Sequence, residues 1–193
     1  MGLFDSFVNK AANQLGNAVK QSATNTENNR KENIVFVSLP ETYEQFISLP
    51  QASLSSPFQT AAMTVLAFCF YPKDSELCYR MIDFLRGPRP MNSSEKSFIA
   101  DRFRDKDYVP RSYFAGATPD NNYQPAAPYT VEVRENQYTY SVEGIAKLFI
   151  PSGGADDPRP IQLRKAKDGK WYLWEYSSIL SGIRQPESSN PWS

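Results

Sequence analysis

The spacing of apolar residues divides the chain into a short N-terminal segment and one larger folded unit. In residues 1–20 the apolar side chains recur every three or four positions, while Asn, Ser, Gln and Lys fill the opposite face. This period predicts an amphipathic helix. Residues 21–33 contain no large apolar side chain and predict a flexible linker. We therefore expect the helix to be tethered to the folded unit without sharing its core.

The first half of the folded unit has mainly helical patterns, after a short β-branched run at residues 34–37 that is typical of a strand. Residues 57–70 are apolar on nearly all sides and predict a central buried helix, opened by a capping Ser56 and by Pro57. A second helix is predicted from Asp74 to a glycine–proline stop, and a third opens with the spacing of a capping box.

The second half has strand patterns instead. Runs rich in β-branched and aromatic residues occupy positions 130–134, 138–150, 161–165 and 171–176. The Asp168-Gly169 pair between the last two is a strong hairpin signal. Together these patterns predict an α+β fold, with N-terminal helices packed on one face of a C-terminal antiparallel β-meander. We expect residues 34–184 to form this single globular domain and residues 185–193 to form a loose tail.

The composition of the chain mainly excludes classes of function. The chain has 21 basic and 21 acidic residues, so it has no overall field to attract nucleic acid, and we expect no nucleic-acid partner. It has no histidine, which rules out Ser-His-Asp and Cys-His nucleophiles and HExxH zinc sites. Cys69 and Cys78 belong to no CxxC motif, and we interpret both as buried thiols. The sequence leans away from an enzyme and predicts no metal and no cofactor.

The N-terminus and the apolar runs bear on localisation. The first residues lack the basic region and the continuous apolar region of a signal peptide. No stretch reaches the roughly 20 apolar residues that a membrane span needs. Both observations favour the cytoplasm.

Four long motifs carry a family resemblance: FLRGPRP at 84–90, KDYVPRSYFAGATPDNNYQPAAPYT at 106–130, SGGADDPRP at 152–160 and DGKWYLWE at 168–175. With them, the chain resembles a domain-of-unknown-function family from gut-dwelling Gram-positive bacteria. The resemblance covers almost the whole chain and implies a bacterial cytoplasmic protein, with no activity, substrate or cofactor to carry over. More loosely, helices followed by a sheet with a DGKWYL strand resemble the cone-shaped pocket folds of the nuclear-transport-factor type.

The first candidate for function is the N-terminal helix. Its apolar face would dock on a protein or on a membrane surface; the docking residues are Leu3, Phe4, Phe7, Val8 and Leu15. The opposite face carries two lysines and one aspartate, which gives little attraction for anionic lipid. A protein partner or a second copy of the chain is therefore favoured, with a weak membrane-surface contact as the alternative.

The second candidate is a ligand site made of basic and aromatic residues: Arg111, Tyr113, Arg159, Trp171 and Trp174. Arg159 follows a Ser-Gly-Gly turn whose N–H groups would face an anion, although a tight link between two strands explains this turn more simply. Trp171 and Trp174 fall on opposite faces of a strand, so at most one packs on the helices.

Two functions from different classes remain open. The first is a non-enzymatic interaction or accessory protein that uses its N-terminal helix for docking. The alternative is a small-molecule-binding or enzymatic cone-shaped domain, in which a tryptophan lines an aromatic pocket and Arg111 or Arg159 selects an acidic ligand.

Overall fold

The computed structural model describes residues 29–191. The predicted N-terminal helix lies outside the described residues, and so does its docking face of Leu3, Phe4, Phe7, Val8 and Leu15. The linker prediction for residues 21–33 falls partly outside them too. Its last residues, from Lys31 onward, begin the first strand.

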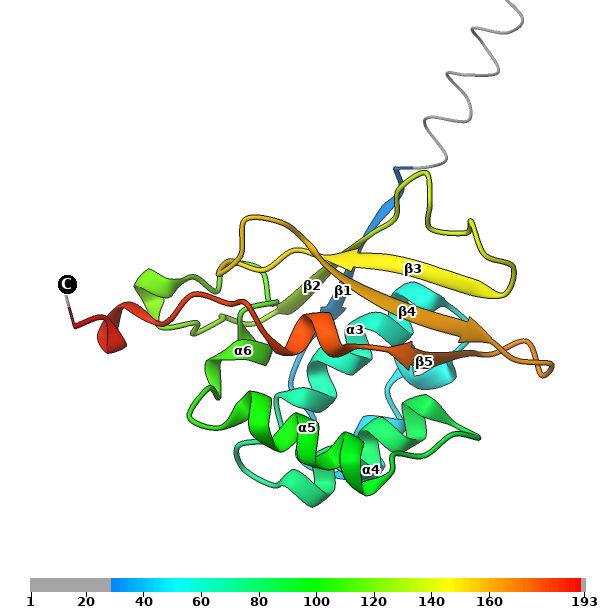
Figure 1. Ribbon diagram of the computed structural model, residues 1–193, viewed down its shortest axis with the longest axis horizontal. Helices are drawn as coiled ribbons and strands as arrows, with labels where there is room; N and C mark the ends of the chain where they lie inside the picture. The colour runs from blue at the N-terminus through cyan, green and yellow to red at the C-terminus, as the bar shows by residue number, and fades with distance from the viewer. Residues whose placement is uncertain (1–28, 192–193) are drawn as a thin grey trace, which may run out of the picture.

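A five-stranded antiparallel sheet forms one layer of the molecule (Figure 1). Its strands follow each other in space in the order of the sequence: β1 (Lys31–Phe36), β2 (Tyr129–Arg134), β3 (Ile145–Ile150), β4 (Arg159–Lys165) and β5 (Trp171–Glu175). Within residues 29–191 the β1 strand comes before the helices, and it pairs with β2 over six positions. The sheet is therefore a meander of four C-terminal strands extended by one N-terminal edge strand.

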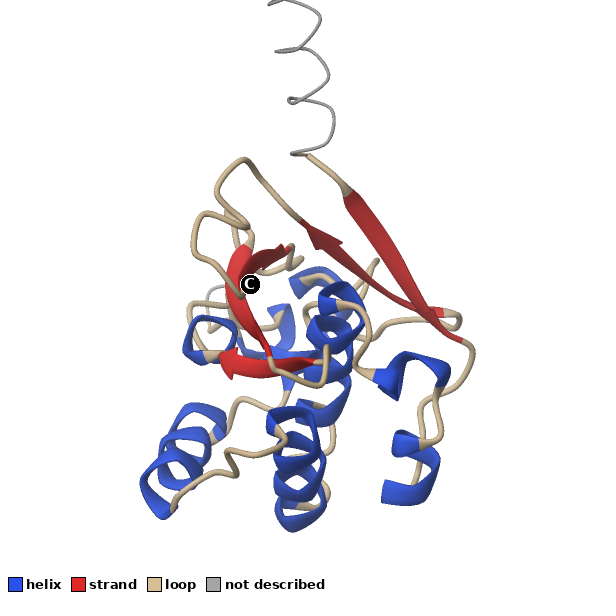
Figure 2. Ribbon diagram, turned by 90° about the vertical axis from the view of Figure 1, so that its right-hand side faces the viewer, coloured by secondary structure: helices blue, strands red, loops and turns tan. Residues whose placement is uncertain are grey.

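The α-helices lie on one side of this sheet (Figures 1 and 2). They are α2 (Tyr43–Ile47), α3 (Pro57–Phe68), α4 (Ser75–Arg86), α5 (Ser93–Phe103) and α6 (Tyr108–Arg111). Short 3₁₀ turns at Pro50–Ser53, Pro119–Asn121, Ser177–Leu180 and Glu187–Ser189 complete the described elements. The predicted α+β class, with helices on one face of an antiparallel meander, is confirmed.

The α3 helix is the centre of the core, as its all-round apolar pattern predicts. Eleven of its twelve residues are buried. The threonines it carries are satisfied by carbonyls, since Thr60 Oγ1 lies 3.1 Å from the Trp171 carbonyl and Thr64 Oγ1 donates to the Thr60 carbonyl. Pro57 takes the first helical position as expected, but the Ser56 side chain makes no capping hydrogen bond, so that part of the prediction is wrong.

The connection between α4 and α5 follows its sequence signals closely. Gly87 ends α4 with a φ of +59°, and a Cβ there would lie 2.2 Å from the Tyr172 ring. Asn92 and Glu95 form the predicted capping box at the start of α5. At this link, Arg89 lies over the Trp174 ring of the edge strand β5, and Arg86, the last residue of α4, lies over the Tyr176 ring just after that strand.

The strand predicted over residues 138–150 is wrong in its first half. The β3 strand begins only at Ile145, and turns occupy most of the residues before it. Thr139 explains the difference, because its Oγ1 accepts the Asn136 N–H at 2.9 Å and its carbonyl accepts the Lys147 N–H. Backbone groups that a strand would need for pairing are thus satisfied locally. The alternating apolar side chains remain largely exposed: Tyr138, Tyr140 and Val142.

The long segment between α6 and β2 is held down by the Ser-Gly-Gly turn after β3. The Gly153 N–H donates to the Ser112 carbonyl, and the two hydroxyls of Ser112 and Ser152 lie 2.8 Å apart. A Cβ on Gly153 would lie 1.9 Å from the Ala117 carbonyl oxygen. The turn is therefore a close backbone contact, and the N–H groups proposed for an anion are used inside the protein.

Candidate functional site

A pocket of about 340 Å³ opens where the α6–β2 segment crosses the C-terminal end of α3. Its lining comes from five separate parts of the chain: Leu39, Cys69, Arg111, Phe114, Gln124, Pro125 and Tyr129. A volume near 300 Å³, mostly apolar walls and a few polar groups are typical of small-molecule sites. We call this site the Arg111 pocket.

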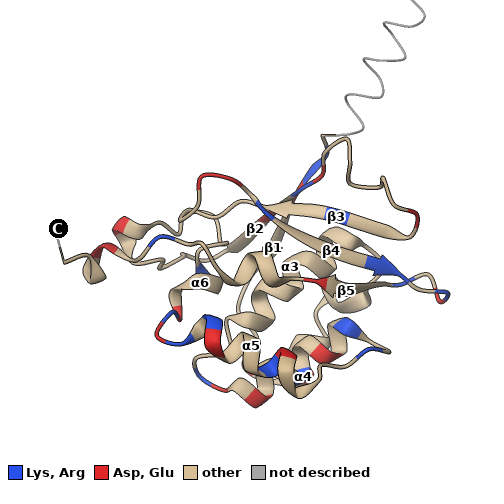
Figure 3. Cartoon of the chain, in the orientation of Figure 1, with Lys and Arg blue, Asp and Glu red and all other residues tan. Residues whose placement is uncertain are grey.

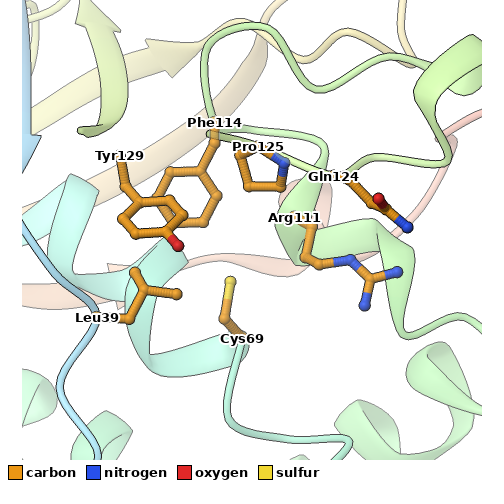
Figure 4. Close-up of a pocket in the computed structure, with 7 residues that line it drawn as sticks. All are labelled: Leu39, Cys69, Arg111, Phe114, Gln124, Pro125 and Tyr129. Carbon is orange, nitrogen blue, oxygen red and sulfur yellow. The ribbon is translucent and has the colours of Figure 1, made fainter. Parts of the chain in front are cut away.

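One end of the Arg111 pocket is apolar. Leu39, Phe114 and Tyr129 gather there, with Pro125 above them (Figure 4). The Phe114 and Tyr129 rings meet edge to face with their centres 5.7 Å apart. Phe114 is held in place by an isolated β-bridge to Val131, which fixes the wall of the pocket to the sheet. This end can accept the apolar body of a ligand.

The other end is polar and carries a positive charge. The Arg111 guanidinium and the Gln124 amide extend to the same side of the pocket (Figure 4). Arg111 donates to Asp107 at 2.8 Å, one turn earlier, but both side chains are substantially exposed, so this pair is weak. Arg111 Nε is buried, and no hydrogen-bond acceptor reaches it from residues 29–191. A ligand oxygen at this end would meet the other guanidinium N–H groups, because the Arg111 side chain is 36% exposed.

Cys69 lies between the two ends, with its sulfur directed into the pocket (Figure 4). Burial raises the pKa of its thiol to about 12, while the nearby Arg111 charge lowers it by a smaller amount. The thiol is therefore protonated at neutral pH and is a poor nucleophile. Cys69 is only partly buried, which corrects its interpretation as a core residue, whereas Cys78 is fully buried as expected.

The side chains of this pocket offer both polar and apolar contacts to a ligand. Across residues 29–191 no group of three or more Cys, Asp or Glu residues could hold a metal ion. Arg111 can orient an anionic oxygen, Gln124 can donate or accept, and the rings supply apolar contact.

The structure does not gather the sequence-predicted ligand residues into one site. Arg111 lines the pocket that carries its name, but Tyr113 points into the core and donates its hydroxyl to the Ile179 carbonyl at 3.0 Å. Arg159 donates to the Gly182 carbonyl near the C-terminus. Trp174 lines a different pocket beside Arg89, and Trp171 packs partly on the core and against Tyr140.

Sequence reasoning misses most of the pocket lining. Leu39, Cys69, Gln124, Pro125 and Tyr129 carry no spacing or motif that connects them. The one signal in the sequence is that Gln124 and Pro125 fall in a long segment, residues 110–128, that is poor in regular structure, and loops of that length are usually functional or fixed to the surface.

The fold and this pocket define a class: an α+β domain with an amphipathic surface pocket. The family model for a domain of unknown function, DUF6935, matches residues 38–187, and the chain belongs to that family. No curated protein and no solved structure matches it. Between residues 29 and 191, none of the helices has both the length and the apolar character required to cross a membrane.

Proposed function

We propose that this protein is a non-enzymatic binding protein that takes a small organic acid in the Arg111 pocket. The observation that carries the proposal is the division of the pocket into an apolar end and an end with the guanidinium of Arg111, whose side chain is 36% exposed. The accessible guanidinium N–H groups would donate charge-assisted hydrogen bonds to a ligand carboxylate. The protonated Cys69 thiol supports binding over covalent chemistry.

Calorimetric titration of the full chain with matched acids and amides tests this proposal. Hexanoate and phenylacetate should bind at least about tenfold more tightly than hexanamide and phenylacetamide, because only the acids offer a charged acceptor to Arg111. Arg111→Gln should abolish that preference. Arg104→Gln is the matched control, since Arg104 is also an exposed arginine paired with a carboxylate on its own segment. Equal affinity for acid and amide would refute the proposal.

Cys69 supplies an independent readout of occupancy. At alkaline pH, where more of this high-pKa thiol is ionised, a bound acid should slow the alkylation of Cys69, whose sulfur lines the pocket. Cys78 has no exposed surface and should stay unmodified with or without ligand. Unchanged Cys69 alkylation at a saturating acid concentration would show that the acid binds elsewhere.

A second candidate function is docking of a protein partner through the N-terminal segment, and we propose a second copy of this chain as that partner. An exposed apolar patch favours it: Tyr138, Tyr140 and Val142 are each more than half exposed. The patch belongs to the β2–β3 connection, and Glu135 in that connection donates its N–H to the Arg30 carbonyl. The β2–β3 connection that carries the patch therefore begins beside the first described residues of the chain (Figure 1).

Sedimentation of the full chain tests the docking proposal. Phe7→Asp puts a charge on the predicted apolar face and should convert a dimer to a monomer, as should Tyr140→Asp in the patch. Asn9→Asp adds the same charge to the predicted polar face and should leave the dimer intact. A monomeric full chain would overturn the proposal, and vesicle binding by that monomer would favour a membrane surface instead. In either form we propose a cytoplasmic protein without a cofactor or a nucleic-acid partner.

A further inference from the structure

A second pocket lies where the β4–β5 hairpin meets the α4–α5 connection. It has a volume of about 200 Å³, and its lining includes Pro88, Arg89, Arg164, Lys165, Tyr172 and Trp174. We call it the Trp174 pocket. It shares no residue with the Arg111 pocket, so its ligand chemistry is independent of the organic-acid binding proposed there.

Positive charge accumulates here although the whole chain is neutral. Basic residues, blue in Figure 3, lie at the end of β4, in the β4–β5 hairpin and in the α4–α5 connection, all at the same end of the molecule. Lys167 and Lys170 continue the basic character along the hairpin. Its one acidic residue, Asp168, accepts from the Tyr172 hydroxyl at 2.8 Å.

The carboxylate of Glu95, beside this pocket, is already paired with the buried Arg86. Glu95 accepts from Arg86 at 2.8 Å, while its oxygen lies 3.7 Å from Arg89. The Arg86 side chain is only 1% exposed and needs that charge for its own burial. Glu175 lies on the far side of Trp174 and accepts from the Ser177 N–H. Arg89 is thus only weakly compensated, and Arg164 and Lys165 have no carboxylate within salt-bridge distance among residues 29–191.

Trp174 holds two of these charges close together. The Arg89 guanidinium carbon lies 4.6 Å from the centre of the ring and that of Arg164 lies 4.5 Å from it. The two guanidinium carbons are therefore at most about 9 Å apart. Both arginines line the same pocket, so an anion held there would be attracted by both charges.

We propose that the Trp174 pocket binds a phosphate monoester through Arg89 and Arg164. Two cations suit a dianion, whereas a single carboxylate would leave one of them uncompensated. Lys165 lies over the Trp171 ring, 5.6 Å from its centre, and adds only to the local positive charge. Stacking of a nucleic-acid base is disfavoured, because guanidinium groups already lie over the Trp174 ring and the Tyr172 ring packs against Gly87. The volume admits the phosphate and the first atoms of its ester, so the rest of the ligand lies outside.

Calorimetry on the full chain at constant ionic strength tests the site. Phosphoserine should bind at least about tenfold more tightly than acetate at pH 7.5, and Arg164→Gln or Arg89→Gln should each weaken it about tenfold or more. Arg80→Gln is the matched control, because Arg80 also lies over a ring, that of Tyr43 at 4.5 Å, but outside the pocket. Hexanoate binding in the Arg111 pocket should be unchanged in all three variants.

The outcomes separate the sources of the phosphate and the ways the proposal fails. A phosphoserine peptide that binds more tightly than phosphoserine would identify a phosphorylated protein, and equal affinities would identify a small phosphate ester. Equal affinity for acetate, or an equal loss in Arg80→Gln, would reduce the site to general charge attraction and overturn the proposal. No phosphoserine binding at millimolar concentration would overturn it as well.

Discussion

Arg86 and Arg111 each end a helix and each border a pocket, yet their surroundings differ in almost every respect. Arg86 is buried and has three acceptors: the Arg89 carbonyl at 2.8 Å, Glu95 at 2.8 Å and the Tyr176 hydroxyl at 3.4 Å. Arg111 is partly exposed, has the single partner Asp107 and keeps a buried Nε without an acceptor among the described residues. The comparison separates an arginine that holds the fold together from one that can bind a ligand.

The difference follows from what surrounds each guanidinium. A buried charge is tolerated only when its donors are satisfied, so the region around Arg86 is closed by α5 and β5. Arg111 lies at the mouth of a pocket, where solvent and the exposed carboxylate of Asp107 are enough to stabilise its charge. Substitutions that disturb the contacts of Arg86 should therefore lower the free energy of unfolding strongly, and substitution of Arg111 should change it little. Ligand affinity in the Arg111 pocket should show the reverse.

The largest expected effect is on the partner of Arg86. Glu95→Ala leaves a buried guanidinium without its counter-charge and also removes the capping box of α5. We expect the free energy of unfolding to fall by about 3 kcal/mol, measured by urea denaturation. Glu76→Ala, in the exposed first turn of α4, is the control and should cost less than about 0.5 kcal/mol. Equal losses in both variants would contradict a structural role for Arg86.

The second-largest expected effect concerns the turn at Gly153, which packs against the segment that forms the wall of the Arg111 pocket. In Gly153→Ala the new Cβ meets the Ala117 carbonyl oxygen, which is backbone and cannot rotate away. We expect a loss of about 2 kcal/mol in the free energy of unfolding. Because the displaced segment carries Phe114, hexanoate affinity should also fall while phosphoserine affinity stays constant. Ala126→Ser, on the exposed part of the same segment, should change neither quantity.

A smaller effect should appear in acid. Burial alone would raise the pKa of Glu95, but the Asn92 N–H and the charges of Arg86 and Arg89 outweigh it and hold the pKa below the usual 4.5. The stabilisation is therefore fully present above about pH 4.5 and is lost as the pH falls through the folded-state pKa. Glu95→Gln should show a shallower loss of stability between pH 5 and pH 3 than the wild type, measured by denaturation at each pH. Parallel curves would show that Glu95 does not titrate with folding.

The smallest expected effect is at Arg111. Arg111→Gln removes one exposed helical ion pair, which lowers the free energy of unfolding, and one unsatisfied donor, which raises it. The two effects oppose each other. We expect the free energy of unfolding to change by less than about 0.5 kcal/mol while the preference for acids over amides disappears. A large loss of stability would mean that Arg111 resembles Arg86, and the distinction between the two regions would fail.

Local signals predict the parts of the fold that depend on neighbours in sequence. The capping box of Asn92 and Glu95, the stop at Gly87 and the Asp168-Gly169 hairpin involve residues within a few positions of one another, and all three form as expected. The strand predicted through Tyr138 and Tyr140 does not form, because a strand depends on a partner that can be distant in the sequence. Alternation shows that side chains can line two faces, but it does not show whether a partner strand is present to pair with.

The candidate sites depend on distant contacts, and the sequence shows only fragments of them. It predicts Arg111 and Trp174 as ligand residues of one shared site, but the two side chains line separate pockets. The partners of Arg111 in its pocket come from before α2, from the end of α3 and from the start of β2. Pattern alone cannot bring these together, because no rule of spacing links residues so far apart in the chain.

By itself, then, the sequence determined the α+β class, the central buried helix and the absence of histidine chemistry, because each follows from composition or from contacts within a few residues. Only the tertiary structure decided which arginine is buried with its charge satisfied and which faces a pocket. That outcome depends on packing: Glu95 of α5 and Tyr176 after β5 pack against Arg86 and bury it, whereas Arg111 is left at an opening between α3 and the α6–β2 segment.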